Sequence, residues 1–131
     1  MKRRVVITGM GVVSPIGNTV DELWSGIENG VCGIDQISYF DLTDYKATLA
    51  AEVKNLDTEK YFSLRDTKNN DRFTLFARIA AKQAVEDANL KVEEINALRY
   101  GCILGSGIGG LQSLEDARNS LTEKGPNRIS P

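Results

Sequence analysis

The sequence predicts an α/β fold in which a sheet is covered by helices on both faces. Two short apolar runs without charge, at residues 5–7 and 100–104, are typical of strands buried on both sides of a sheet. Each run leads through a glycine-rich turn into a segment whose apolar residues recur at helical spacing. With one helix and one strand between them, these segments give an alternating order of strands and helices.

The first helix is expected between Thr19 and Gly30. Thr19 and Glu22 form a capping-box pattern, in which the hydroxyl accepts from the Glu22 N–H and the carboxylate reaches back to the Thr19 N–H. Gly30 suits the left-handed position that follows a helix. The chain therefore enters this helix directly after the first glycine-rich turn.

The middle of the chain is expected to hold loops, a strand at residues 48–53 and the longest helix. Residues 64–70 are expected to form a loop in which basic side chains predominate. Asn70 is expected to cap the longest helix, with Asp71 in its first turn, and Asn89 to end it. Small residues spaced every three to four positions would let this helix lie close against a sheet: Ala77, Ala80, Ala81, Ala84 and Ala88.

The glycine-rich turn before the last helix has two interpretations. Gly105, Gly107 and Gly110 satisfy G-x-G-x-x-G, so free N–H groups at the helix start can hold a dinucleotide pyrophosphate. A Rossmann site also needs a second strand that ends in an acidic residue about 20 positions further on, whereas Glu123 falls within the predicted helix. The other interpretation is structural, because glycines let a strand and a helix pack closely.

Length and composition narrow the classes of function. The 131 residues suit one domain or one half of a larger domain. With 16 basic and 18 acidic residues, the net charge of −2 gives no global positive field for a nucleic acid. No apolar run approaches the length of a membrane span, so we expect no membrane segment and a cytoplasmic location.

Histidine is absent, and Cys32 and Cys102 are the two cysteines. The absence of histidine excludes Ser-His pairs, Cys-His pairs and histidine metal ligands within this chain. Two cysteines so far apart indicate neither a disulfide framework nor a zinc site. We therefore expect reduced, buried thiols, no metal ion and no cofactor.

Four motifs occur in order along the chain: RRVVITGMGVVSPIGN at 3–18, DRFT at 71–74, GSGIGGL at 105–111 and GPNRISP at 125–131. Together they resemble the amino-terminal third of a β-ketoacyl-[acyl-carrier-protein] synthase of the synthase II type. The resemblance covers the whole chain. It implies the thiolase fold, in which a mixed five-stranded sheet lies between helices in each of two similar halves. Residues 1–131 are then the amino-terminal portion of this domain, truncated before the catalytic cysteine.

The resemblance also implies an activity for the full-length protein, a decarboxylative Claisen condensation in fatty acid biosynthesis. An acyl group moves from its carrier to a cysteine, malonyl-carrier loses carbon dioxide, and the resulting carbanion attacks the thioester. The family's cysteine and two histidines would lie beyond residue 131, since neither Cys32 nor Cys102 matches the nucleophile motif. We therefore expect no catalytic residue in this chain and no activity of the chain alone.

Site residues and partners follow from the same resemblance. It places Ile108 and Gly107 in the wall of an acyl pocket near a dimer interface, and Arg65, Lys68 and Arg128 on a docking surface. The partner would be acyl carrier protein bearing acyl or malonyl phosphopantetheine, and the full-length protein a homodimer without nucleic-acid or membrane partners. The alternatives are a stand-alone nucleotide-binding module at 105–110 and an inactive module that binds a carrier protein through its basic loops.

Overall fold

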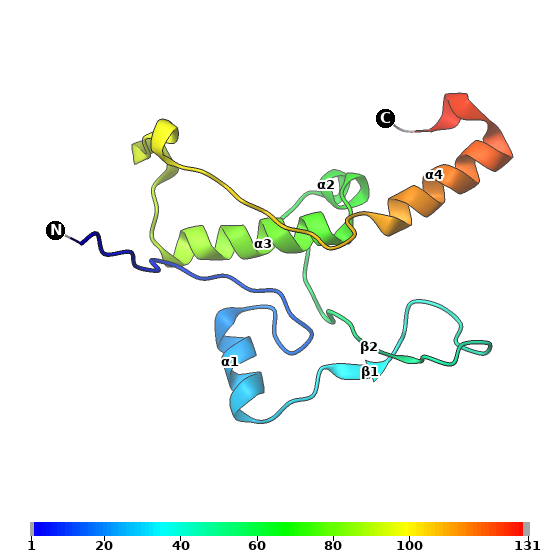
Figure 1. Ribbon diagram of the computed structural model, residues 1–131, viewed down its shortest axis with the longest axis horizontal. Helices are drawn as coiled ribbons and strands as arrows, with labels where there is room; N and C mark the ends of the chain where they lie inside the picture. Colours follow the sequence, from blue (N-terminus) through cyan, green and yellow to red (C-terminus); the bar gives the residue numbers. More distant parts are fainter. Residues whose placement is uncertain (1, 130–131) are drawn as a thin grey trace.

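The computed structural model describes residues 2–129, which are arranged around one long central helix, α3 (Figure 1). The helices are α1 (Val20–Glu28), α2 (Leu64–Asn69), α3 (Arg72–Asp87) and α4 (Leu111–Lys124). Two short strands and three 3-10 turns complete the elements: β1 (Ile34–Gln36), β2 (Leu49–Ala51), η1 (Val92–Glu94), η2 (Ala97–Arg99) and η3 (Pro126–Arg128). The three predicted helices are confirmed as α1, α3 and α4, and the strand predicted at 48–53 as β2.

The longest helix supplies the core of the described chain. Its Leu75 and Ile79 are buried, and Ile79 is 0% exposed. Gly9 and Gly11 pack so closely on the alanine face of α3 that neither has room for a Cβ. The close packing predicted from the alanine spacing is therefore present, although the partner of the helix is an extended segment rather than a formed sheet.

Polar side chains of α3 hold this extended segment in place. The Asp87 carboxylate accepts a hydrogen bond of 2.8 Å from the Met10 N–H. One turn earlier, the Gln83 side chain accepts from the Val12 N–H at 3.0 Å and donates to the Asn18 carbonyl at 2.7 Å. The backbone of this extended segment is thus hydrogen-bonded to a helix and not to a neighbouring strand.

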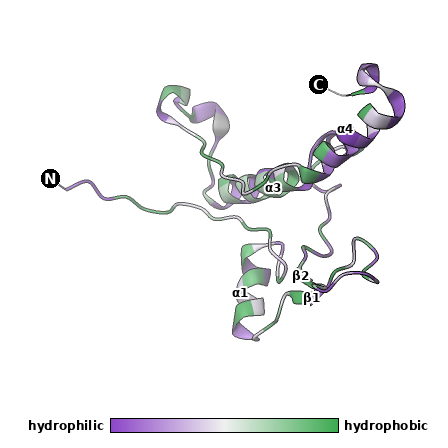
Figure 2. Ribbon diagram, turned by 45° about the vertical axis from the view of Figure 1, so that its right-hand side comes forward, coloured by the Kyte–Doolittle hydropathy of each residue, from purple (hydrophilic) through white to green (hydrophobic). Residues whose placement is uncertain are grey.

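The two buried strands predicted at 5–7 and 100–104 are wrong for the part of the chain that the structure describes. Both segments are extended but belong to no strand ladder, and Val5 is 94% and Ile103 100% exposed. Figure 2 shows apolar residues along both of these extended segments. A strand that is buried on both faces needs neighbouring strands for its backbone and helices that cover its side chains, and between residues 2 and 129 the only sheet is the pair β1–β2.

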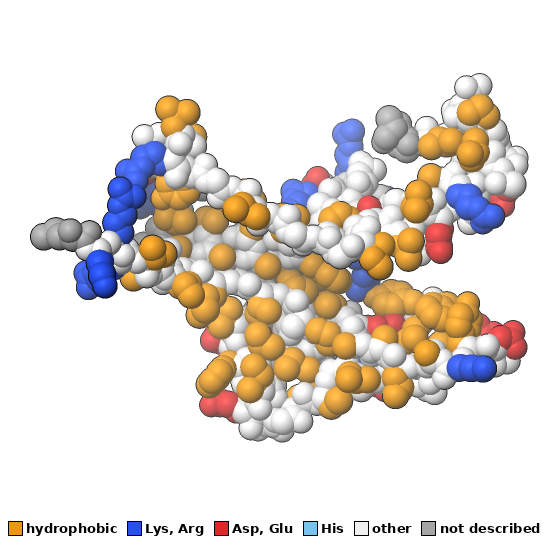
Figure 3. Space-filling model, viewed as in Figure 1, with side chains coloured by type: hydrophobic (Ala, Val, Ile, Leu, Met, Phe, Trp, Pro, Cys, Tyr) orange, Lys and Arg blue, Asp and Glu red, His pale blue; other side chains and the backbone are white. Residues whose placement is uncertain are grey.

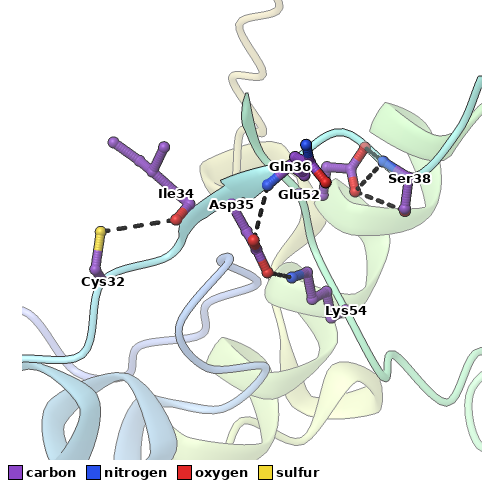
Figure 4. Close-up of polar contacts among 7 residues, drawn as sticks. All are labelled: Cys32, Ile34, Asp35, Gln36, Ser38, Glu52 and Lys54. Atoms are coloured by element: carbon purple, nitrogen blue, oxygen red, sulfur yellow. Dashed lines mark hydrogen bonds and ion pairs between the residues drawn. The ribbon is translucent and has the colours of Figure 1, made fainter. Parts of the chain in front are cut away.

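The sheet β1–β2 is antiparallel, with Ile34 opposite Ala51. β1 was not predicted, because its three residues are all exposed and carry no apolar pattern. Polar side chains link the β1 segment to the β2 segment (Figure 4): Lys54 donates to the Asp35 carboxylate at 2.7 Å, and the Ser38 hydroxyl donates to Glu52 at 2.7 Å. The hydrogen bond from Lys54 holds the pKa of Asp35 below its ordinary value and raises the pKa of Lys54.

These shifts predict that acid loosens the β1–β2 pair. A lowered folded pKa means that Asp35 stabilises the pair above the ordinary aspartate range, and that this stabilisation is lost as pH falls through the folded pKa. In the full-length protein, amide protection factors at 34–36 and 49–51 should fall between pH 7 and pH 3. Asp35→Asn should remove that dependence, whereas Asp44→Asn, at an exposed position nearby, should keep it. Equal pH dependence in all three proteins would contradict the assignment.

Helix ends were predicted from local chemistry with small differences. The Thr19 hydroxyl accepts from the Glu22 N–H at 3.2 Å as expected, but the Glu22 carboxylate accepts from the Asn18 N–H at 2.7 Å instead of the threonine N–H. Gly30 and Asn89 have the positive φ angles predicted for them, 64° and 49°. The cap of α3 is Asp71, not Asn70, because the Asn70 amide donates to the Asp66 carbonyl and closes α2.

Residues 64–70 were expected to form a loop, but residues 64–69 form the helix α2 and Asn70 ends it. The Ser63 hydroxyl accepts from the Asp66 N–H at 3.2 Å and donates to the Asp66 carboxylate at 2.7 Å. The hydroxyl contact is the main cause that lowers the pKa of Asp66. This pattern of Ser63 followed by an acid three residues later is a capping signal, and it sets the orientation of the basic residues that follow.

Candidate functional site

The turn at residues 105–110 joins the second extended segment to α4. Ser106 accepts a hydrogen bond of 3.0 Å from the Gly109 N–H, and Gly109 has a φ of 79°, which favours glycine. A Cβ placed at Gly107 would meet nothing within 4 Å, and Ile108 is 80% exposed. Gly107 and Ile108 therefore form an open surface on which a further group can lie.

One end of this turn is anchored on α3. The Asp71 carboxylate accepts a hydrogen bond of 2.5 Å from the Ser113 hydroxyl of α4. A Cβ at Gly110 would overlap the same carboxylate, and the Phe73 ring lies 4.0 Å from the Cβ position of Gly109. A cleft of about 890 Å³ lies at this junction, lined by residues 68–73, 109–113 and Asp116.

This geometry argues against the dinucleotide interpretation of the turn. A phosphate cradle needs unoccupied N–H groups and a positive field at the start of the helix. Here the Asp71 carboxylate lies against Gly110, so a negative charge already occupies the start of α4. A pyrophosphate at the same place would face like-charge repulsion.

The basic residues predicted to dock a partner occupy two elements. Arg65 and Lys68 are exposed on α2, and Arg128 is exposed in η3. The two ion pairs found among residues 2–129, Lys54–Asp35 and Lys91–Glu94, involve none of them. Figure 3 shows basic groups over α2 and, separately, near the end of α4. Adjoining clefts join these regions, one lined by Lys68 and Asn69 and the next by Asn69 and Arg128.

Further cations near α2 are held by aromatic rings, which the sequence interpretation missed. The Arg78 guanidinium lies 4.3 Å from the centre of the Phe62 ring, and the Lys60 and Lys82 ammonium groups lie 5.6 and 5.5 Å from that of Tyr61. The signal in the sequence was the aromatic pair that follows Lys60. Such contacts restrict the cations while leaving their charge available.

The sequence model of the family described as Beta-ketoacyl synthase, N-terminal domain, matches residues 2–131 of the chain. The chain belongs to this family. Three similar relatives carry the name 3-oxoacyl-[acyl-carrier-protein] synthase 2. The protein from Vibrio cholerae is 46% identical over 130 residues, that from Synechocystis 44% over 130, and that from Staphylococcus aureus strain COL 46% over 129. The matches cover 98–99% of this chain but 31% of each relative, so the chain spans about a third of their length.

Solved structures give the same relationship at the level of the fold. One is the ketosynthase assembly AntDE:AntF, a type II PKS acyl-carrier protein in complex with its ketosynthase bound to the hexaketide. The match covers 99% of this chain and 33% of the ketosynthase chain, with a TM-score of 0.78 and 25% sequence identity. The ishigamide ketosynthase/chain length factor matches 100% of this chain and 33% of its own with a TM-score of 0.78 and 28% identity. The predicted fold class, the amino-terminal part of a thiolase-like fold, is thereby confirmed.

The cysteines of this ketoacyl synthase segment differ from expectation. Cys32 and Cys102 are both exposed free thiols, so the prediction of buried thiols is wrong. Cys102 is exposed for the same reason as its neighbours in 100–104, since no strand pairs with them within residues 2–129.

Among residues 2–129, no group of three or more His, Cys, Asp and Glu side chains is arranged so that it could hold a metal ion. None of the helices described is both long and apolar enough to cross a membrane.

Proposed function

We propose that this chain is the amino-terminal part of a β-ketoacyl-[acyl-carrier-protein] synthase of the synthase II type, an acyltransferase of fatty acid biosynthesis. The observation that carries the proposal is the family match over residues 2–131, with relatives named as synthase 2 at 44–46% identity. The reaction would transfer an acyl group from its carrier to an enzyme cysteine and release carbon dioxide from malonyl-carrier. The resulting carbanion would then attack the acyl carbon, and the cysteine thiolate would leave.

Within this proposal, residues 1–131 provide binding surfaces and not the reacting groups. The sequence has no histidine, and its two thiols are exposed. Among the polar groups of residues 2–129, Cys32 contacts only the Ile34 carbonyl, at 3.9 Å, which is no base that could ionise the thiol. A nucleophile needs such an activating partner. The cysteine and the imidazoles would therefore come from the rest of the protein.

The chain alone should accordingly produce no ketoacyl product. Purified 131-residue protein would be incubated with acyl-carrier and malonyl-carrier, and the products followed by mass spectrometry. The full-length protein under the same conditions should form a ketoacyl-carrier whose acyl group is two carbons longer than that of the primer. Product from the chain alone would contradict the assignment of the chemistry to the remaining part.

For the partner, we assign Arg65, Lys68 and Arg128 to the surface that docks acyl carrier protein. Their exposure and their lack of ion-pair partners within residues 2–129 support this. Arg78 and Lys82 add positive charge on α3, and Lys60 contacts the same Tyr61 ring as Lys82. One of the similar ketosynthase structures is itself a complex with an acyl-carrier protein. Exposed charges contribute about 0.2–1 kcal/mol each and act mainly on encounter and orientation.

Reversing Arg65 and Lys68 to glutamate in the full-length protein should therefore raise KM for carrier-bound substrates several-fold while leaving short pantetheine thioesters nearly unaffected. The increase should shrink at high salt, because screening removes the same attraction. A matched control reverses Arg3 and Arg4, which carry the same charge at the exposed amino-terminal segment. Equal losses for both substrate types would show that these residues have a structural role.

For the assembly, the proposed full-length form is a cytoplasmic homodimer. The apolar side of α4 is exposed, with Leu111 at 51% and Leu114 at 66%. This exposure supports the proposal that another protein surface packs against the helix. In the same proposal Ile108 and Gly107 line the acyl pocket. Their open position in the turn supports this role, because no group of the described chain covers them.

A further inference from the structure

The start of α4 has no capping group of its own. Its N-cap residue is Gly110, which has no side chain, and its first turn contains no acidic residue. The first N–H groups of a helix have no partners within the helix, and the partial positive charge there favours a nearby anion. A helix that begins on glycines therefore needs a stabilising group from elsewhere.

That group comes from α3. Asp71 stands at the N-cap position of α3, yet its side chain makes no capping hydrogen bond to its own helix. Its carboxylate instead accepts from the Ser113 hydroxyl in the first turn of α4 and lies where a Cβ of residue 110 would be. Asp71 and Ser113 are 42 positions apart, so this contact fixes the two helix starts relative to each other.

The contact also determines where the preceding turn lies. Cβ atoms at Gly105 and Gly107 would meet nothing within 4 Å, and the Ser106 bond to the Gly109 N–H is internal to the turn. Between residues 2 and 129, the turn is therefore anchored mainly at its last two glycines, by the Asp71 carboxylate and the Phe73 ring. A shift of α4 relative to α3 would move Ile108 with it.

We infer that Asp71, acting through Ser113, is a positioning residue that holds the start of α4 against the start of α3 and fixes the turn carrying Ile108. The inference rests on the proposed function, in which Ile108 faces the acyl chain. Gly110 is required because any larger residue would displace the carboxylate. Acyl-length selectivity then depends on a hydrogen bond made outside the pocket wall.

The test uses four variants of the full-length protein. Ser113→Ala removes the donor, Asp71→Asn removes the charge with nearly the same shape, and Ser113→Thr keeps a hydroxyl. Glu115→Gln is the matched control, because that exposed carboxylate of α4 lies outside the cleft that Asp71 and Ser113 line. Loss of one such side-chain hydrogen bond corresponds to about a fivefold change in an equilibrium.

Two measurements are expected to change together. Ser113→Ala and Asp71→Asn should increase amide exchange at residues 105–114 about fivefold. They should also change the ratio of kcat/KM between long and short acyl primers by a similar factor, while Ser113→Thr and Glu115→Gln resemble the parent. Because Ser113 is exposed, its alanine variant should fold even if Asp71→Asn does not.

Unchanged exchange in Ser113→Ala would overturn the inference whatever the activity does. So would faster exchange with an equal kinetic loss for every acyl length. Failure of the proposed pocket has a different signature: Ile108→Phe would leave the length profile unchanged while the exchange effect of Ser113→Ala persisted. The two ideas can therefore fail separately.

Discussion

Replacing Ile108 by phenylalanine should suppress reaction with long acyl primers while sparing short ones. In the proposed pocket, the larger ring would occupy the volume that the far end of a long chain needs. Overpacking costs about 1–3 kcal/mol, which corresponds to a loss of roughly 5- to 150-fold in kcat/KM for long primers. The side chain is 80% exposed and lies outside the core of Leu75 and Ile79, so the substitution leaves the packing of this segment intact.

The measurement is kcat/KM of the full-length protein for a series of primers of increasing length. Leu98→Phe adds the same ring at another exposed turn, where the wild-type leucine is 97% exposed, and should leave the profile unchanged. Equal loss at all lengths in Ile108→Phe would indicate general damage and remove this residue from the pocket wall.

The chain alone should expose apolar surface, bind a hydrophobic dye and associate. Only Leu75 and Ile79 are buried apolar side chains among residues 2–129, whereas Val5, Ile7 and Ile103 are 94%, 83% and 100% exposed. Contiguous apolar patches and unpaired extended edges of this kind promote association. So small a core also gives little enthalpy for a cooperative melt.

Dye fluorescence, size-exclusion chromatography and calorimetry of the 131-residue protein would measure these effects. A matched pair of variants sharpens the test. Val5→Lys with Ile103→Lys should reduce association of the chain alone, because charges protect exposed edges, yet the same pair should destabilise the full-length protein. A soluble monomer with a sharp cooperative transition would contradict the expectation.

The features that the sequence predicted well depend on neighbours in the chain. Thr19 with Glu22 determines the start of α1, and Gly30 and Asn89 have the positive φ angles that their chemistry favours. Recognition of the family succeeded for another reason, since four motifs in a fixed order identify a long-range arrangement without requiring its geometry to be derived.

The features that sequence patterns missed depend on distant parts of the chain. The apolar runs at 5–7 and 100–104 indicate burial in a sheet, but pairing requires strands that residues 2–129 do not contain. The local pattern places Asp71 in the first turn of its own helix, and nothing in that pattern shows that its carboxylate accepts a hydrogen bond from Ser113. The roles of Ile108, Arg65, Lys68 and Arg128 stay predictions for the same reason.

The attachment of the first extended segment to α3 has a consequence for strand register. Residues four apart on a helix advance by about 6 Å, close to the roughly 6.6 Å that separates alternate residues of an extended chain. Asp87 and Gln83 can therefore bind the N–H groups of Met10 and Val12 at the same time, as they do here. A slip of one residue would break both bonds and force side chains larger than glycine onto the alanine face. Any strand that pairs with this segment thus meets a backbone whose register the helix has already determined.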